Sequence, residues 1–355
     1  MRPLRVGIIG QGRSGRNIHS EFLKQIPERF HIAAVCDCLQ DRCERAAQDY
    51  GCPVFQDYHE MLNNKDLNLD FVLNSSFSHL HPPITKEIME AGFHVLCEKP
   101  LAKTAEQVHD LIATSKRTGR TLAIYQQSRF APYYRQVCKV IASGVLGDIR
   151  MVKCAFNGFS RRYDWQTLQK YNAGNLYNTG PHPMDQVLGL IGRDIMPEVW
   201  CKMDVVNCLG DAEDFCKIIL SYPGRPVIDL EICSNSNYNP YTYQVYGTYG
   251  SLMGNMTHLD WKYYIPAEAP AVALHEAPLP GPSYCSDKIV FHEESWDVPD
   301  EDKDLFGSMA GRFYNNLYDV LTTGAPLAVT PEQVCQQIAV MDECHRQNPL
   351  PKKFC

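Results

Sequence analysis

Short apolar runs alternate with amphipathic stretches over the first 125 residues of the chain. Near-continuous apolar runs are typical of parallel strands that are buried on both faces. The stretches between them repeat apolar residues at helical spacing and end at a glycine or before a proline. We expect strands at Leu4–Ile9, Ile32–Cys36, around Val54, Phe71–Leu73, Val95–Cys97 and Leu122–Tyr125, with helices at Gly12–Gln25, Leu39–Tyr50, Pro83–Ala91 and Thr104–Thr118. This order predicts an α/β fold that begins with a Rossmann domain over residues 1–125.

The pattern changes after residue 125, where a helix at Pro132–Ser143 precedes a strand at Ile149–Phe156. Several strand-like runs follow over residues 199–265 and are divided by Gly, Pro and Asn. This spacing favours a mostly antiparallel sheet. Residues 126–355 are therefore expected to form a C-terminal α+β domain that contains a large, mostly antiparallel open sheet.

The last hundred residues contain a polar segment and then two predicted helices. Residues 266–304 hold several prolines and an acidic run from Glu293 to Asp304, which is typical of an exposed loop. The apolar stripe from Ala310 to Leu321 predicts one helix, and the capping box at Thr330–Gln333 predicts the start of another. We expect both helices to pack back toward the N-terminal domain.

The composition indicates where the protein is located and which classes of partner it does not bind. A net charge of -7 argues against general binding to nucleic acid or to an anionic membrane. No apolar run approaches the roughly 20 residues that span a bilayer, and the chain enters its first strand too soon after Met1 for a signal peptide. The 15 cysteines are odd in number, irregularly spaced and without a C-x-x-C pair, which favours reduced thiols in the cytoplasm and no metal site.

A glycine-rich turn follows the first predicted strand. Gly10-Gln11-Gly12-Arg13-Ser14-Gly15 fits the pattern G-x-G-x-x-G between a strand and a helix. The first glycine permits the tight turn, the second lets the backbone approach a pyrophosphate, and the third lets the helix pack closely on the strand. We expect all six residues to contact a dinucleotide.

Asp37, at the end of the second predicted strand, indicates which dinucleotide binds. It lies 22 residues beyond Gly15, where a carboxylate accepts hydrogen bonds from the adenosine ribose and repels a 2′-phosphate. NAD is therefore favoured. The arginines close by, Arg42 among them, keep NADP open as the weaker alternative.

Two further segments resemble the glucose–fructose oxidoreductase / inositol dehydrogenase / rhizopine catabolism (Gfo/Idh/MocA) family. One runs from Asp70 to His81 and continues to the tripeptide Glu98-Lys99-Pro100, which matches the family's E-K-P signature. The other, A-G-N-L-Y-N-T-G-P-H-P-M-D from Ala173, is similar to the family's G-G-x-L-x-D-x-G-x-H-x-x-D. The resemblance implies a Rossmann domain followed by an open sheet through which subunits associate, usually as dimers or tetramers.

The resemblance also implies the chemistry of the site. Lys99 would bind the oxygen of a substrate hydroxyl and also contact the cofactor, and His182 would accept the hydroxyl proton. Asn178 stands where the family pattern has an aspartate. An amide can hold a substrate hydroxyl but cannot stabilise an imidazolium by charge. We therefore expect His182 to act alone or with Lys99, while Asn178 binds the substrate.

Other positions are assigned by the same resemblance. Arg162 and Trp165 are candidate substrate contacts, because a tryptophan face packs on the C–H side of a sugar, and packing with surface charge is the equal alternative. The remaining expected cofactor contacts are Ser76, Phe77, His81, Glu98 and Gln127.

These residues favour an NAD-dependent dehydrogenase that oxidises a secondary hydroxyl of a sugar, glycoside or cyclitol to a ketone. C3 of a glycoside is one candidate position of oxidation. The alternatives on the same fold are a non-catalytic regulator that senses NAD or a sugar, and a reductase of a non-sugar carbonyl.

Overall fold

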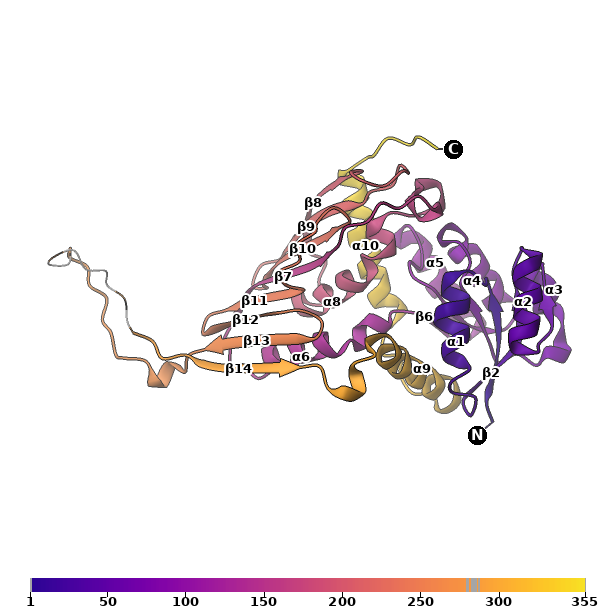
Figure 1. Ribbon diagram of the computed structural model, residues 1–355, viewed down its shortest axis with the longest axis horizontal. Coiled ribbons are helices and arrows are strands. Elements are labelled where there is room, and N and C mark those ends of the chain that lie inside the picture. The colour runs from indigo at the N-terminus through magenta and orange to yellow at the C-terminus, as the bar shows by residue number, and fades with distance from the viewer. Residues whose placement is uncertain (1, 279–280, 282–285, 287, 355) are drawn as a thin grey trace.

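The N-terminal part of the computed structural model is a six-stranded parallel sheet in the order β3-β2-β1-β4-β5-β6, with helices on both faces (Figure 1). The structure describes residues 2–278, 281, 286 and 288–354. The strands are β1 (Leu4–Ile9), β2 (Phe30–Cys36), β3 (Val54–Phe55), β4 (Phe71–Asn74), β5 (His94–Cys97) and β6 (Leu122–Ile124), and the helical segments are η1 (Ser14–Ser20), α1 (Glu21–Leu23), α2 (Gln40–Tyr50), α3 (Tyr58–Asn63), η2 (Lys65–Leu67), η3 (Ser78–Leu80), α4 (His81–Glu90) and α5 (Ala105–Thr118). The predicted Rossmann fold is confirmed.

Local sequence signals explain where these elements begin and why they are buried. Strands β1 and β4 are almost wholly out of solvent, as their continuous apolar runs predict. Helix α5 begins at a capping box, in which Thr104 accepts the backbone N–H of Gln107 and the Gln107 side chain accepts the N–H of Thr104.

The C-terminal part contains an eight-stranded sheet in the order β14-β13-β12-β11-β7-β10-β9-β8. All neighbouring pairs are antiparallel except β7 and β10, so the predicted, mostly antiparallel sheet is confirmed. Its strands are β7 (Ile149–Asn157), β8 (Glu198–Asp204), β9 (Phe215–Ser221), β10 (Val227–Cys233), β11 (Tyr243–Gly247), β12 (Gly250–Gly254), β13 (His258–Tyr263) and β14 (His292–Asp297). The helical segments of this part are η4 (Gln127–Phe130), α6 (Pro132–Ala142), η5 (Trp165–Thr167), η6 (Gln169–Tyr171), α7 (Asn175–Asn178), α8 (Pro181–Ile191), η7 (Pro266–Glu268), η8 (Asp300–Asp302), α9 (Leu305–Thr323) and α10 (Pro331–Gln347).

Strand β14 corrects the expectation of a continuous loop over residues 266–304. It forms the edge of the sheet and pairs with β13 from His292 to Asp297, which is the first half of the acidic run. Basic partners on β13 make this possible: Lys262 Nζ lies 2.7 Å from Glu293, and His258 Nδ1 lies 2.8 Å from Asp297. Opposite charges facing each other across two strands stabilise the pairing, which an apolar pattern alone does not reveal.

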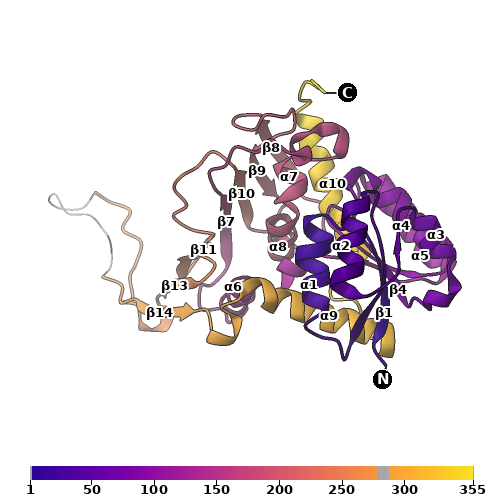
Figure 2. The same cartoon turned by 45° about the vertical axis from the view of Figure 1, so that its right-hand side comes forward.

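The last two helices connect the halves of the chain. Phe313, Tyr314 and Leu317 of α9 join the apolar core that contains Val6 and Ile8 of β1. Helix α10 packs against α5 on one side and β8 on the other. Figures 1 and 2 show α8 and α10 on the face of the large sheet that is turned toward the Rossmann domain. In the described part of the chain, no helix is long and apolar enough to cross a membrane, and the described cysteines are free thiols.

Candidate active site

The glycine-rich turn forms a close-fitting loop between β1 and η1. Gly10 has φ +91°, and a Cβ there would lie 2.5 Å from the carbonyl oxygen of Ser75. A Cβ on Gly15 would lie 1.8 Å from the carbonyl oxygen of Gly10. At Gly12 the nearest atom to such a Cβ is Arg42 Nη1 at 3.6 Å. The outer two glycines thus hold the loop on the sheet, while the space over the middle one is open, as a pyrophosphate cradle requires.

Asp37 is fixed to this loop. Its Oδ2 accepts the backbone N–H of Gln11 at 2.7 Å, and its Oδ1 accepts that of Leu39 at 3.0 Å. Arg42 Nη1 lies 3.3 Å from the same carboxylate. The predicted residues Gln11, Asp37 and Arg42 are therefore brought together at the edge of the cradle, with Arg13 exposed and Ser14 half-buried in the loop itself. These residues fit a dinucleotide.

Three expected cofactor contacts in and after the loop that follows β4 differ in their exposure to solvent: Ser76, Phe77 and His81. Ser76 is half-buried, and both its N–H and its hydroxyl donate to Asn74 Oδ1. Phe77 is exposed. His81 is buried, with Nδ1 2.7 Å from the Pro100 oxygen and Nε2 3.1 Å from the Ser76 oxygen. These two contacts join the loop after β4 to the loop that contains Pro100. Burial lowers the pKa of His81. A cofactor contact for His81 stays a prediction.

Lys99 follows β5 and is half-buried. Its Nζ donates to the backbone oxygen of Asn178 at 2.7 Å, and its backbone N–H donates to Glu98 Oε2 at 2.9 Å. Burial lowers the pKa of Lys99, and the charges of Arg13 and Arg162 lower it further against the attraction of Glu98. The lysine is thus held at a boundary between the two halves of the chain.

Glu98 belongs to a buried relay that sequence reasoning did not find. His19 of η1 is fully buried, with Nε2 2.9 Å from Glu98 Oε1 and Nδ1 2.6 Å from the hydroxyl of Tyr314 on α9. Although burial raises the pKa of Glu98, the hydrogen bond and charge of His19 outweigh it and the pKa falls to about 2. Glu98 is therefore an ionised carboxylate that accepts the backbone N–H of Lys99 and attracts its charge.

His182 lies at the start of α8, four residues after Asn178. Its Nδ1 is buried and has no hydrogen-bond partner within the described residues. Burial, together with the charge of Lys99, lowers the pKa of His182 to about 3 despite the attraction of Glu98. The imidazole is consequently neutral at physiological pH, and one of its two ring nitrogens carries a free lone pair.

Helix α8 is itself anchored by buried charges. Asp185 is out of solvent and accepts hydrogen bonds from Arg129 Nε at 2.9 Å and from Arg193 Nη1 at 3.2 Å. These bonds fix the helix that carries His182. Gln127, in the turn η4 beside Arg129, is buried, and its Oε1 has no partner within the described chain.

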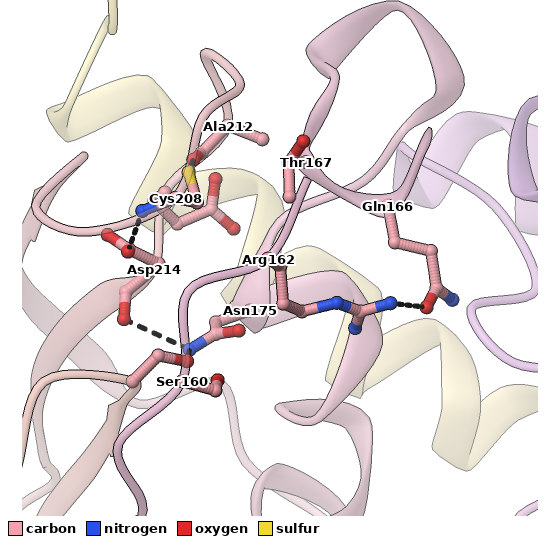
Figure 3. Close-up of a pocket in the computed structure, with 10 residues that line it drawn as sticks. Ser160, Arg162, Gln166, Thr167, Asn175, Cys208, Ala212 and Asp214 are labelled. Atoms are coloured by element: carbon pink, nitrogen blue, oxygen red, sulfur yellow. Dashed lines mark hydrogen bonds between the residues drawn. The ribbon is translucent and has the colours of Figure 1, made fainter. Parts of the chain in front are cut away.

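A small cavity opens between Lys99 and the segment that carries Asn178, and His182 is not among the residues that line it. It is lined by Ser78, Lys99, Pro100, Gln166, Asn172, Ala173, Tyr177 and Asn178. A second cavity lies behind Gln166, and Arg162 is among the residues that line it (Figure 3). Lys99 and Asn178 are therefore brought together at one cavity. Arg162 lines the other cavity and contacts Gln166, which lines both.

Trp165 borders neither of these cavities. It packs edge-on against Phe77 with ring centres 4.7 Å apart, and Tyr171 stacks on Phe77 at 5.3 Å. This cluster joins the loop after β4 to the second half of the chain. A sugar contact for Trp165 stays a prediction.

Sequence reasoning also missed Gln166 and Glu213. Gln166 directly follows Trp165, one of the two candidate substrate contacts, so its position next to that residue was a usable signal. Glu213 is far away in sequence, but it is buried beside Gly174, and its Oε1 accepts the N–H of Leu176 in the turn that leads to Asn178.

A Rossmann domain with a dinucleotide cradle, followed by a sheet domain that supplies a neutral histidine beside a lysine, defines a two-domain oxidoreductase. Comparison with known proteins agrees. A family model described as an oxidoreductase family with an NAD-binding Rossmann fold matches residues 4–126, and its C-terminal alpha/beta domain matches residues 139–348. The chain belongs to the Gfo/Idh/MocA oxidoreductase family.

Relatives with curated names include dehydrogenases of cyclitols and glucosides. The scyllo-inositol 2-dehydrogenase (NADP(+)) of Bacillus subtilis is 26% identical, over 96% of this chain and 92% of that protein. The D-glucoside 3-dehydrogenase of Escherichia coli is 30% identical, over 54% of each chain. Among solved structures, the WlbA dehydrogenase of Bordetella pertussis, in complex with NADH and UDP-GlcNAcA, aligns with a TM-score of 0.80 at 20% identity, over 98% of this chain and 96% of that one. This last likeness is one of fold.

Proposed function

We propose that the protein is an NAD-dependent dehydrogenase that oxidises a secondary hydroxyl of a sugar, glycoside or cyclitol to a ketone. The observation that carries the proposal is the contact of Lys99 Nζ with the backbone oxygen of Asn178, four residues before His182, whose pKa the charge of Lys99 helps to lower. The nicotinamide, when bound, accepts the hydride. Lys99 holds the hydroxyl oxygen and stabilises the charge that develops on it, and His182 takes the hydroxyl proton.

NAD is proposed over NADP because the Asp37 carboxylate stands at the loop where a 2′-phosphate would lie. The adjacent Arg42 and the NADP-linked inositol dehydrogenase among the relatives are the arguments for the other cofactor. Residues 1–125 would bind the cofactor, and residues 126–355 would bind the substrate and join subunits as a dimer or tetramer.

The relatives suggest the substrate class. They include inositol 2-dehydrogenases and a D-glucoside 3-dehydrogenase. We therefore propose that the substrate is a ring with several hydroxyl groups. Oxidation at C3 of a glycoside is the specific form that we favour, with Arg162, Trp165 and Asn178 as contacts of the ring.

The test is the appearance of NADH or NADPH absorbance with each cofactor against a panel of inositols, free hexoses and methyl glucosides. We expect turnover with NAD and at least one glucoside or inositol. His182→Ala should lower kcat by roughly 10²–10⁴-fold, whereas His31→Ala, an exposed histidine of β2, should leave it unchanged. An inactive panel would contradict the proposed substrate class, and near-normal turnover by His182→Ala would contradict the assigned proton acceptor.

A further inference from the structure

We propose that Gln166 is a positioning residue that turns the side-chain amide of Asn178 so that its NH2 group, rather than its oxygen, faces the substrate. The proposal rests on the function proposed above and goes beyond it, because it states what kind of oxygen the site recognises next to Lys99.

Four side chains form a hydrogen-bonded relay that ends at the cavity. The Arg162 guanidinium donates to both oxygens of Asp164, at 3.1 and 2.6 Å, and its Nη2 also donates to Gln166 Oε1. Gln166 Nε2 then donates to Asn178 Oδ1 at 3.2 Å. Figure 3 shows the Arg162 side chain extended toward Gln166. The relay therefore runs from Asp164 at the surface to Asn178 beside Lys99.

The chemistry of arginine fixes the direction of every bond in this relay. A guanidinium has donors and no acceptor, so the oxygen of Gln166 must face Arg162. The nitrogen of Gln166 is then left for the oxygen of Asn178. Asn178 Nδ2, which makes no hydrogen bond within the described residues, is the group that remains for a ligand in the cavity.

Lys99 and Asn178 consequently present donors to the cavity. Lys99 Nζ and Asn178 border the same cavity, and no carboxylate does. A ring substituent that lies against Asn178 must accept a hydrogen bond, so an ether, glycosidic or carbonyl oxygen fits there as well as a hydroxyl does. An aspartate at position 178, as in the family pattern, would instead require a hydroxyl that donates.

The first experiment needs no substrate and measures urea unfolding of Gln166→Glu, Asn178→Asp and the double variant. Each single change keeps one donor–acceptor pair between positions 166 and 178, so the urea concentration at the midpoint of unfolding should shift little. The double change puts two carboxylates against each other, and its midpoint should fall by clearly more than the sum of the single shifts. Gln136→Glu on α6, combined with Asn178→Asp, adds the same charges and should show no excess. Additive shifts in the first pair would overturn the proposal.

The second experiment measures KM and kcat for methyl glucoside and for its 2-, 4- and 6-deoxyfluoro analogues. Fluorine cannot donate a hydrogen bond. At the ring position that faces Asn178, the wild type should tolerate fluorine, whereas Gln166→Glu turns the Asn178 oxygen to the cavity and Asn178→Asp places a carboxylate there. Both variants should lose at least about tenfold in kcat/KM for that analogue relative to methyl glucoside, mainly through KM.

The two experiments separate the possible failures. Unchanged fluorine tolerance at every position in both variants would overturn the role of Gln166 while leaving the dehydrogenase intact. A wild type that oxidises no methyl glucoside would contradict the glucoside form of the proposed function, and the unfolding measurements would still decide whether the relay exists.

Discussion

Glu213 is a buried carboxyl group that supports the turn carrying Asn178. Burial raises the pKa of this group from 4.5 to about 8, against the hydrogen bonds that it accepts from its own backbone N–H and from that of Leu176. The protonated form is therefore the stable one at neutral pH. It lies close enough to Gly174 that any Cβ there would collide with the carboxyl group.

This pKa predicts how stability depends on pH. The folded protein keeps the proton of Glu213 up to about pH 8, whereas the unfolded chain releases it near pH 4.5. Folding thus takes up a proton between these values, and the free energy of unfolding falls as the pH rises. We predict that Glu213→Gln gains stability relative to the wild type from about pH 5 to about pH 8, by on the order of a few kcal/mol.

Urea unfolding at several pH values checks this prediction. Glu106→Gln on α5, where the carboxylate is exposed, is the control and should differ from the wild type by the same small amount at every pH. A difference between Glu213→Gln and the wild type that stays constant across the range would show that Glu213 is ionised in the folded protein.

At the scale of elements, a buried hydroxyl group of α9 adds a polar contact with the Rossmann domain to the apolar packing between them. Tyr314 contacts His19 at 2.6 Å, and His19 in turn contacts Glu98. We predict that Tyr314→Phe lowers the free energy of unfolding by roughly 1–3 kcal/mol, because it leaves a buried ring nitrogen without its partner. Thermal or urea unfolding measures the change.

Tyr318, one turn later on α9, offers a matched control. Its ring packs edge-on against Phe30 at 5.7 Å, as that of Tyr314 does at 5.4 Å, but its hydroxyl makes no hydrogen bond within the described residues. Tyr318→Phe should therefore cost much less. Equal losses in the two variants would mean that ring packing, and not the contact with His19, accounts for the effect.

The elements that the sequence predicted are those with local signals. Strand β1 is an unbroken apolar run, and α5 carries its own capping box, so both could be placed from neighbouring residues alone. Strand β14 could not be placed in this way, because its acidic residues are stabilised in a strand by Lys262 and His258, which lie opposite them on β13.

The site shows the same division. Lys99 and His182 lie in short motifs and could be recognised from sequence. His19 and Glu98 are 79 positions apart, and Gln166 and Asn178 are 12 apart with a turn between them. Those contacts are made by the fold, and no pattern of neighbouring residues indicates them. Trp165 shows the same limit: its sequence context favours a sugar contact, and its packing on Phe77 is a contact that the sequence did not indicate.

At the scale of the whole molecule, the large sheet has one covered and one open face. Helices α8 and α10 lie on the side turned toward the Rossmann domain (Figure 2). On the opposite face the strand register places Trp200 of β8 and Met253 of β12 in one row across the sheet. Their side chains are 55% and 47% exposed. Between them the row holds Ile219, Asp229, Lys153 and Gln244, so this face mixes apolar and polar side chains, as the interfaces between proteins do.

We predict that this open face joins subunits, as expected from the sequence, and that Trp200→Glu disrupts the assembly. The wild type should elute as a dimer or tetramer when light scattering follows gel filtration, and Trp200→Glu should shift toward the monomer as it is diluted, because a charge would be buried without a partner. Phe306→Glu, at the start of α9 and 44% exposed, lies off this face and should leave the assembly intact. If Trp200→Glu keeps the wild-type mass at every concentration while Phe306→Glu loses it, subunits associate through the side of the molecule that carries α9 and not through the sheet.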